Sequence, residues 1–139
     1  MPIENEAATM SSTVPAANLW AGGIISGLVI AFLIFDGVTK LMRIAPVIEA
    51  SAKLGLPAEI LPAIGILLLA CTALYAVPKT AILGAILLTA YLGGATAIHV
   101  RTAAGAFPVG FSVGFGLLAW LGIVLREPRL IRWILFRQL

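Results

Sequence analysis

Four apolar runs dominate the chain, and short polar segments separate them. The runs lie near residues 19–42, 58–77, 80–101 and 109–126. Each is long enough to cross the roughly 30 Å hydrocarbon core of a bilayer as a helix that rises about 1.5 Å per residue. Because hydrocarbon cannot satisfy exposed backbone groups, segments this long and apolar must be helical. The pattern predicts an all-α fold, an integral membrane four-helix bundle.

The ends of the runs carry the residues expected at a membrane surface. Lys79 and Arg101 bracket the third run, and only His99 interrupts its uncharged interior. Trp20 and Lys40 stand near the two ends of the first run. Aromatic and basic side chains are typical interfacial anchors, so these positions support the span assignment.

The termini have a different composition from the spans. Residues 1–17 contain two glutamates, two prolines and a Ser/Thr cluster without Lys or Arg, which indicates a polar, flexible tail and no secretory signal. Residues 18–126 form the predicted transmembrane domain. In residues 127–139, Arg129, Arg132 and Arg137 alternate with large apolar residues, which predicts a short basic amphipathic helix on the membrane surface.

The connections and small residues suggest how the spans pack. The polar stretch Glu49–Pro57 is too short and too charged to span, and Gly105–Pro108 reads as a turn. Tyr75 marks the exit of the second span. Small residues four apart allow close helix packing. They are Gly22 with Ser26, Gly23 with Gly27, Ala90 with Gly94, and Gly110 with Gly114.

Composition agrees with a membrane protein. Hydrophobic residues make up 61% of the 139 and charged residues 11%, against roughly 25% charged in a soluble domain. The mean hydropathy is +1.10. The net charge of +3 comes from residues that flank apolar runs, which argues against a nucleic-acid partner. Cys71 is the only cysteine, so no intrachain disulfide can form, and we interpret it as a buried small residue.

Orientation follows from the basic residues. The first and third connections hold Lys40, Arg43, Lys53 and Arg101, whereas the other side holds five, four of them near the C-terminus. Because basic residues favour the cytoplasmic side, the count predicts that both termini lie in the cytoplasm.

Most ionisable residues near the spans fall at one end of the predicted bundle. In four antiparallel spans, the end of the first, the start of the second and the end of the third share a membrane face. Ionisable groups in spans are costly and are candidates for function. The candidate pocket residues are Asp36, Lys40, Glu49, Glu59, Tyr91, Thr96, His99 and Arg101.

Two interpretations of this cluster are open. As a pocket, it would place a histidine that can transfer protons near neutral pH close to Asp36, which stands four residues before Lys40. We expect His99 to face the bundle interior and to contact Asp36 or Glu59. Alternatively, Asp36–Lys40 and Glu49–Arg101 are structural ion pairs and His99 caps the bundle. One histidine and one cysteine cannot build a usual zinc site, so no metal site is predicted.

Several sequence strings point to a family. Along the third span and its approach stand LYAVPKT at 74–80, LGA at 83–85, LLT at 87–89, YLGGA at 91–95 and HVR at 99–101. The first connection carries Gly37, Lys40-Leu41, Pro46, Glu49, Leu54-Gly55 and Pro57, and LREPRL occupies 125–130. Together these strings closely resemble the DoxX-like family of small bacterial membrane proteins, over roughly residues 20–135.

The resemblance implies a four-helix membrane bundle and a multi-pass location in the bacterial inner membrane. Some members of the wider group are linked to electron transfer from thiosulfate to quinone and to thiol-stress complexes. Relatives often carry a glutamate in the second helix where this chain has Leu68. A proton or quinone role that depends on that glutamate does not transfer directly.

Three functions are compatible with these observations. The first is an accessory or lipophilic-ligand-binding subunit of a membrane redox or detoxification system, with a quinone as one candidate ligand. Its partners would be the lipid bilayer, a lipophilic small molecule, and a redox subunit or a second copy of the chain. The second is a membrane isomerase or hydrolase with Asp36, His99 and Arg101 as catalytic candidates. A variant with a haem on His99 is disfavoured, because that single histidine is the only residue that supports it. The third is a structural or transport component.

Overall fold

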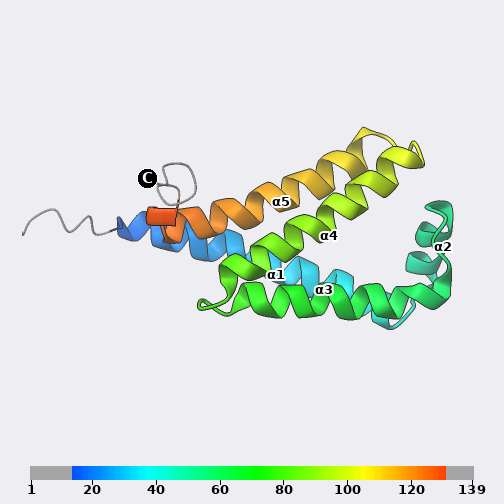
Figure 1. Cartoon of the computed structure of the whole chain (residues 1–139), viewed down its shortest axis with the longest axis horizontal. Coiled ribbons are helices and arrows are strands. Elements are labelled where there is room, and N and C mark those ends of the chain that lie inside the picture. The colour runs from blue at the N-terminus through cyan, green and yellow to red at the C-terminus, as the bar shows by residue number, and fades with distance from the viewer. Residues whose placement is uncertain (1–13, 131–139) are drawn as a thin grey trace, which may run out of the picture.

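The computed structural model describes residues 14–130, in which every regular element is a helix (Figure 1). The elements are α1 (Ala16–Leu41), α2 (Ala45–Lys53), the 3-10 turn η1 (Ala58–Ile60), α3 (Leu61–Ala76), α4 (Ala81–Arg101) and α5 (Ala106–Arg126). Four helical segments in the described part of the chain are long and apolar enough to cross a membrane, with η1 and α3 forming one of them. The predicted four-helix membrane fold is therefore confirmed.

The helix boundaries differ from the prediction in three places. Helix α1 starts at Ala16, inside the segment predicted as a polar tail. Residues Ala45–Lys53 form helix α2, whereas the sequence indicated only a polar connection from Glu49. Pro108 lies in the first turn of α5 and not in the preceding loop. A proline is tolerated there because the first backbone N–H groups of a helix have no acceptor within it.

The turns between helices use backbone conformations that suit glycine. Gly55, after α2, has φ +74°, and Gly105, before α5, has φ +98°. Such angles cost a glycine little, because it has no Cβ. The predicted surface helix at 127–139 lies mostly outside the described residues, as does most of the predicted tail at 1–17.

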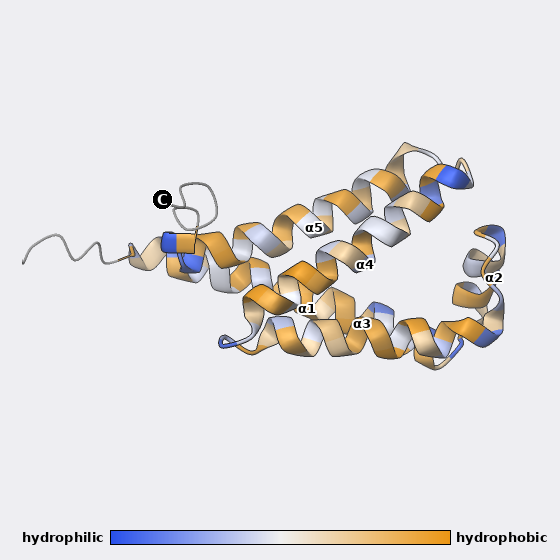
Figure 2. Ribbon diagram, viewed as in Figure 1, coloured by the Kyte–Doolittle hydropathy of each residue, from blue (hydrophilic) through white to orange (hydrophobic). Residues whose placement is uncertain are grey.

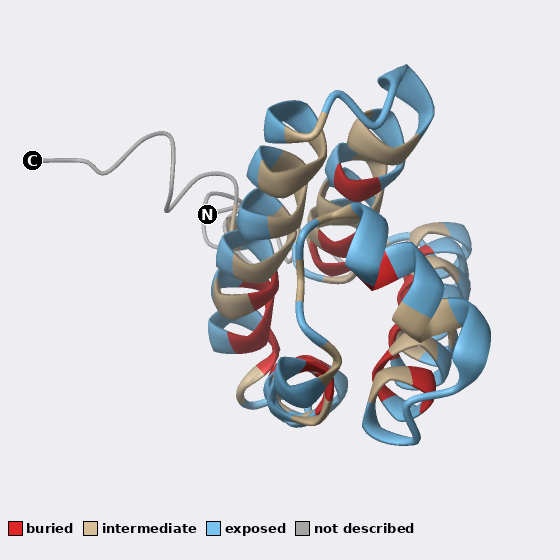
Figure 3. Cartoon of the chain, turned by 90° about the vertical axis from the view of Figure 1, so that its right-hand side faces the viewer, coloured by how far each residue is buried: buried red, intermediate tan, exposed pale blue. Residues whose placement is uncertain are grey.

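The four spans pack as a ring of neighbours. Helix α1 packs against α3 and α5, and α4 packs against the same two helices. Buried residues lie on the facing sides, and exposed residues cover the outer surfaces (Figure 3). Cys71 is buried in the core, as the sequence indicated. The residues of the buried core are Val29, Leu33, Leu68, Cys71, Tyr75, Ala81, Ala85, Leu88, Ala119 and Ile123.

Small residues allow close approach at some predicted positions and not at others. A Cβ on Gly122 of α5 would lie 2.3 Å from Ser26 Oγ, and one on Gly22 would lie 2.9 Å from the Gly122 carbonyl. The Gly22–Ser26 pair therefore allows close helix packing, as predicted, and its partner is α5. The other predicted glycines do not make close contacts, because a Cβ on any of them would meet nothing within 4 Å. They are Gly23, Gly27, Gly94, Gly110 and Gly114.

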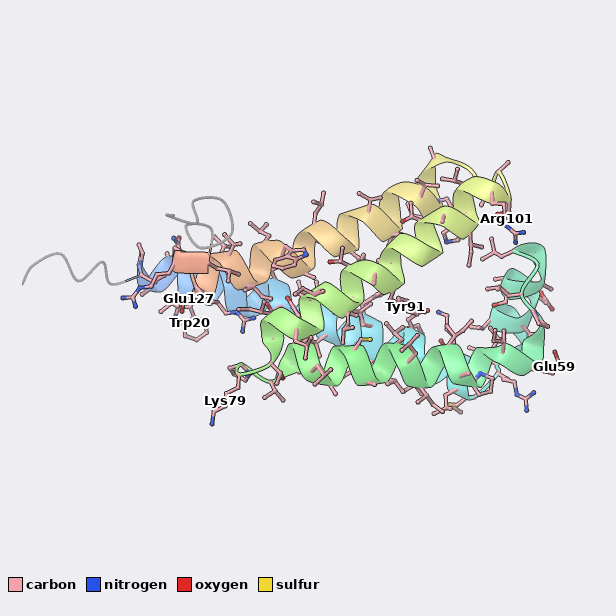
Figure 4. The ribbon with its side chains drawn as sticks, viewed as in Figure 1. Trp20, Glu59, Lys79, Tyr91, Arg101 and Glu127 are labelled. Atoms are coloured by element: carbon pink, nitrogen blue, oxygen red, sulfur yellow. The ribbon has the colours of Figure 1, made fainter. Side chains whose placement is uncertain are left out.

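The polar residues collect at the two ends of the bundle (Figure 2). Arg101 and Glu59 lie at one end, and Lys79 and Glu127 lie at the other (Figure 4). This arrangement agrees with the topology derived from the sequence. Helix α2 lies at the first of these ends, beyond the ends of α3 and α4, and it contacts α1 and η1 (Figure 1).

Candidate ligand cavity

A cavity of about 620 Å³ lies at the α2 end of the bundle. All four spanning segments and α2 contribute to its wall. Most lining side chains are apolar, among them Leu33, Val47, Leu61, Ile64, Ile98 and Phe115. A concave, mostly apolar site with a few polar groups is the usual form of a small-molecule pocket.

Asp36 and Lys40 of α1 contribute an ion pair to this cavity. The Lys40 ammonium donates a hydrogen bond to Asp36 Oδ1, and both side chains are partly buried. The pair forms because residues four apart lie one above the other on a helix, with the acid N-terminal to the base. Each charge is thus neutralised locally, which lowers the cost of placing both near hydrocarbon.

Tyr91 and His99 of α4 are the other polar side chains predicted for the pocket that line this cavity. Tyr91 lies midway along α4 (Figure 4). His99 lies in the last turn of α4, two residues before Arg101. The structure thus brings four of the eight predicted pocket residues to one cavity: Asp36, Lys40, Tyr91 and His99.

The His99 side chain has an unsatisfied polar atom. Its Nδ1 is buried and has no hydrogen-bond partner among the described residues. The expected contact with Asp36 or Glu59 is not made, since Asp36 pairs with Lys40 and Glu59 is exposed. A buried polar atom without a partner typically costs about 1–3 kcal/mol, so this nitrogen marks a position where a further hydrogen bond would be favourable.

A second cavity of about 470 Å³ adjoins the first. It lies between α2 and the connection from α4 to α5, and its polar lining residues are Glu49, Lys53, His99 and Thr102. Pro46, Ala50, Leu54 and His99 line both cavities. Helix α2 and His99 therefore form the boundary between an apolar inner cavity and a more polar outer one.

The remaining candidates lie elsewhere. Glu49 lines only the outer cavity, and Glu59 and Arg101 line neither. Thr96 donates its hydroxyl hydrogen bond to the Leu92 carbonyl of its own helix. No ion pair joins Glu49 to Arg101 in residues 14–130. The three catalytic candidates are thus not assembled, because Arg101 is outside the cavity that Asp36 and His99 share.

Sequence reasoning missed two groups of cavity residues. Phe32 of α1 contacts Phe111 and Phe115 of α5, with ring centroids 5.3 and 4.5 Å apart, and these rings form an aromatic wall. The spacing of four between Phe111 and Phe115 was the available signal, since it places both rings on one helix face. Pro46, Val47, Ala50, Ser51 and Leu54 were missed because the α2 segment was not predicted to be helical.

Tyr75 lies one residue before the end of α3, as the sequence indicated, and its side chain faces the core. It is 1% exposed, and its hydroxyl donates a hydrogen bond to the Ala119 carbonyl on α5 at 2.8 Å. The Ser26 hydroxyl on α1 lies 3.1 Å away. Tyr75 thus connects three helices at the end of the bundle remote from the cavity.

Leu68 faces the core and lines neither cavity. Its side chain is fully buried, and the Thr72 hydroxyl donates a hydrogen bond to the Leu68 carbonyl. The position that the resemblance pairs with a glutamate of relatives is therefore part of the apolar packing in this chain.

Four apolar spanning segments packed around one core define the chain as a multi-pass helical membrane protein. The comparisons with known proteins make the assignment narrower. The sequence model of the DoxX-like family matches residues 24–122, which is more than half of the chain, and the chain belongs to that family. Comparison with curated proteins and with solved structures gave no match.

Proposed function

We propose that this DoxX-like membrane protein binds a lipophilic small molecule in its inner cavity, as an accessory subunit of a membrane redox or detoxification system. The observation that carries the proposal is the cavity of about 620 Å³ at the α2 end. Its volume falls in the range of about 300–1,000 Å³ that is typical of small-molecule sites. We further propose a bacterial inner-membrane location, with both termini in the cytoplasm and the cavity at the outer face.

The lining suits an apolar ligand with one polar part. The aromatic wall of Phe32, Phe111 and Phe115 offers ring faces, while His99 offers a hydrogen-bonding group. A quinone ring fits such a lining, and when bound it would supply reversible two-electron redox chemistry. The residues of this chain would hold the ring against the aromatic wall and position a carbonyl near His99.

Binding is favoured over catalysis by the state of the ionisable groups. The Asp36 carboxylate is engaged by Lys40, and Arg101 lines neither cavity. A general acid–base pair must reach the same reacting atom within hydrogen-bond distance. Only His99 among the three catalytic candidates offers a buried polar atom without a partner to a bound molecule.

The ligand-binding proposal is tested with two adjacent glycines of α4. A Cβ on Gly94 or on Gly93 would meet nothing within 4 Å, but only Gly94 lines the cavity. Gly94→Leu should fill part of the cavity without disturbing helix packing, and Gly93→Leu is the matched control. Each variant is extracted into polymer nanodiscs, and small molecules that co-purify are identified by mass spectrometry.

A molecule retained by the wild type and by Gly93→Leu but lost from Gly94→Leu is the expected result. If all three proteins carry the same small molecules in the same amounts, the cavity does not bind them.

The accessory role has a separate test. Chemical cross-linking in native membranes should recover a second subunit with the protein, whereas recovery of the chain alone would contradict that role and leave ligand binding unaffected.

A further inference from the structure

The junction between the two cavities indicates the shape of the ligand. The inner cavity is lined mainly by apolar side chains at the depth of the spans, and the outer cavity lies beside the connection from α4 to α5. His99 and α2 residues Pro46, Ala50 and Leu54 line both. A molecule that spanned both cavities would therefore place an apolar body along Tyr91 and a polar head at His99.

The charges around the two cavities constrain that head. Asp36 and Lys40 line the inner cavity, and Glu49 and Lys53 line the outer one. Each cavity thus has one carboxylate and one ammonium, and no surplus charge. Asp36 and Lys40 already pair with each other, so a charged head that entered the inner cavity would lose hydration without finding a free counter-ion there, which is unfavourable near hydrocarbon. An uncharged head does not carry this cost.

The unsatisfied nitrogen supplies the remaining contact. His99 Nδ1 is buried at the junction and makes no hydrogen bond to the described residues. A neutral imidazole nitrogen either donates or accepts, according to its tautomer, and a hydroxyl group can do both. A hydroxyl head therefore satisfies Nδ1 in either tautomer.

Building on the proposed function, we propose that the ligand is an uncharged amphiphile whose polar head forms a hydrogen bond with His99 Nδ1. Its apolar part extends into the inner cavity, past Ile98 and Ala95 towards Tyr91. The Asp36–Lys40 ion pair stays closed, because each partner already satisfies the other. The head is thus held at the membrane face and the body at the depth of the spans.

The test uses three photoreactive probes of equal chain length. Each has a diazirine in a dodecyl chain, and the terminal group is a hydroxyl, a methyl or a carboxylate. The full-length protein in phosphatidylcholine nanodiscs is irradiated with each probe, and labelled peptides are mapped by mass spectrometry. Wild type, His99→Phe, His99→Gln and Tyr91→Phe are compared, so that differences in probe partitioning into lipid cancel.

In the wild type, the alcohol should label cavity residues about fivefold more than the methyl probe after correction for partitioning, as one hydrogen bond would allow. His99→Phe keeps a planar ring but removes both nitrogens, and the ratio of alcohol to methyl labelling in this variant should fall to about one. His99→Gln restores a neutral hydrogen-bonding group and should recover part of the preference. Tyr91→Phe should keep it, because Tyr91 lies beside the apolar body.

Other outcomes overturn the inference in distinguishable ways. Equal labelling of cavity residues by alcohol and methyl probes means that water or no group satisfies Nδ1, and the ligand-binding proposal then stands alone. Preferential labelling by the carboxylate contradicts an uncharged head. If Tyr91→Phe loses the alcohol preference and His99→Phe keeps it, the polar head lies at Tyr91 and not at His99, which contradicts the inference. Labelling confined to lipid-facing residues contradicts both the inference and the proposed function.

Discussion

The hydroxyl group of Tyr75 on α3 donates a hydrogen bond to the backbone carbonyl of Ala119 on α5, with an O–O distance of 2.8 Å. Helices α3 and α5 are not neighbours in the ring, since each packs against α1 and α4. Tyr75 therefore crosses the bundle interior. The Ser26 hydroxyl on α1, 3.1 Å away, brings a third helix into the same network.

Removal of the Tyr75 hydroxyl should weaken the bundle without opening a cavity. Tyr75→Phe leaves the ring in place but removes the bond to Ala119 and leaves the buried Ser26 hydroxyl without this partner. Hydrogen bonds between membrane helices average about 0.6 kcal/mol and reach about 1.7 kcal/mol. We expect a loss of about 1 kcal/mol in the free energy of unfolding, measured by denaturing-detergent titration.

A double-mutant cycle with Ser26→Ala checks the network. If the two hydroxyl groups act together, the double variant should lose less stability than the sum of the single variants. Strict additivity would show that Tyr75 and Ser26 contribute independently, and unchanged stability in Tyr75→Phe would contradict the interior role.

The first turn of α4, which approaches the end of α3, should not tolerate a side chain at Gly84. A Cβ there would lie 2.2 Å from the Tyr75 backbone nitrogen and 2.4 Å from its Cα. Because these are backbone atoms, the helices must move apart, and overpacking typically costs about 1–3 kcal/mol. Gly84→Ala should therefore lower the melting temperature in detergent.

Gly93→Ala is the control on the same helix, because its Cβ would meet nothing within 4 Å. Alanine is favoured over glycine within a helix by about 1 kcal/mol in soluble hosts, so this variant should be neutral or stabilising. Equal destabilisation by both substitutions would contradict the close approach of α4 to the end of α3.

The spans could be predicted because each apolar run is long and contains few charged residues, so hydrophobicity alone defines it. Helix α2 could not, because Ala45–Lys53 has nine residues, follows Arg43 and contains Glu49 and Lys53. Its helical form depends on tertiary packing, with Ser51 buried against its neighbours. Such packing leaves only a weak trace in a segment this short.

The candidate site was predicted in part for a related reason. Topology alone brings Asp36, Lys40 and His99 to one end, and the structure gives these three residues and Tyr91, which lies deeper on α4, a common cavity. The direction in which each side chain points could not be predicted from the sequence. Asp36 meets Lys40 and not His99, since an intrahelical neighbour is always within range while an interhelical one depends on rotation of both helices.

The membrane orientation can be measured with two single cysteines. Cys71 is first replaced by alanine, and Lys79→Cys or Glu59→Cys is then introduced; both native positions are exposed and lie at opposite ends of the bundle. With both termini in the cytoplasm, a membrane-impermeant maleimide should label Glu59→Cys in intact bacterial cells. Lys79→Cys should be labelled only after permeabilisation.

The reverse labelling pattern would place the cavity at the cytoplasmic face and invert the orientation. Labelling of both positions in intact cells would mean that the two ends are not separated by a bilayer. The Cys71→Ala protein without an added cysteine reports background labelling.

The last prediction concerns Leu68, where the DoxX-like pattern indicates a glutamate. The Leu68 side chain is fully buried, in a cluster with Val29, Leu33 and Cys71. A carboxyl group introduced by Leu68→Glu would therefore enter an apolar environment, and an acidic residue at the centre of a span costs about 2.5–3.5 kcal/mol. Leu68→Met, which keeps volume and polarity, should cost less than about 1.5 kcal/mol.

Both variants are compared with wild type by denaturing-detergent titration, and Leu68→Gln separates the effect of polarity from that of charge. We expect the free energy of unfolding to fall from wild type through Leu68→Met and Leu68→Gln to Leu68→Glu, because polarity rises along this series at a site without a hydrogen-bonding partner. If Leu68→Glu were as stable as Leu68→Met, water or a polar group would have to reach position 68. The inner cavity would then extend to position 68, and a proton-transfer role for this position would again be open in this chain.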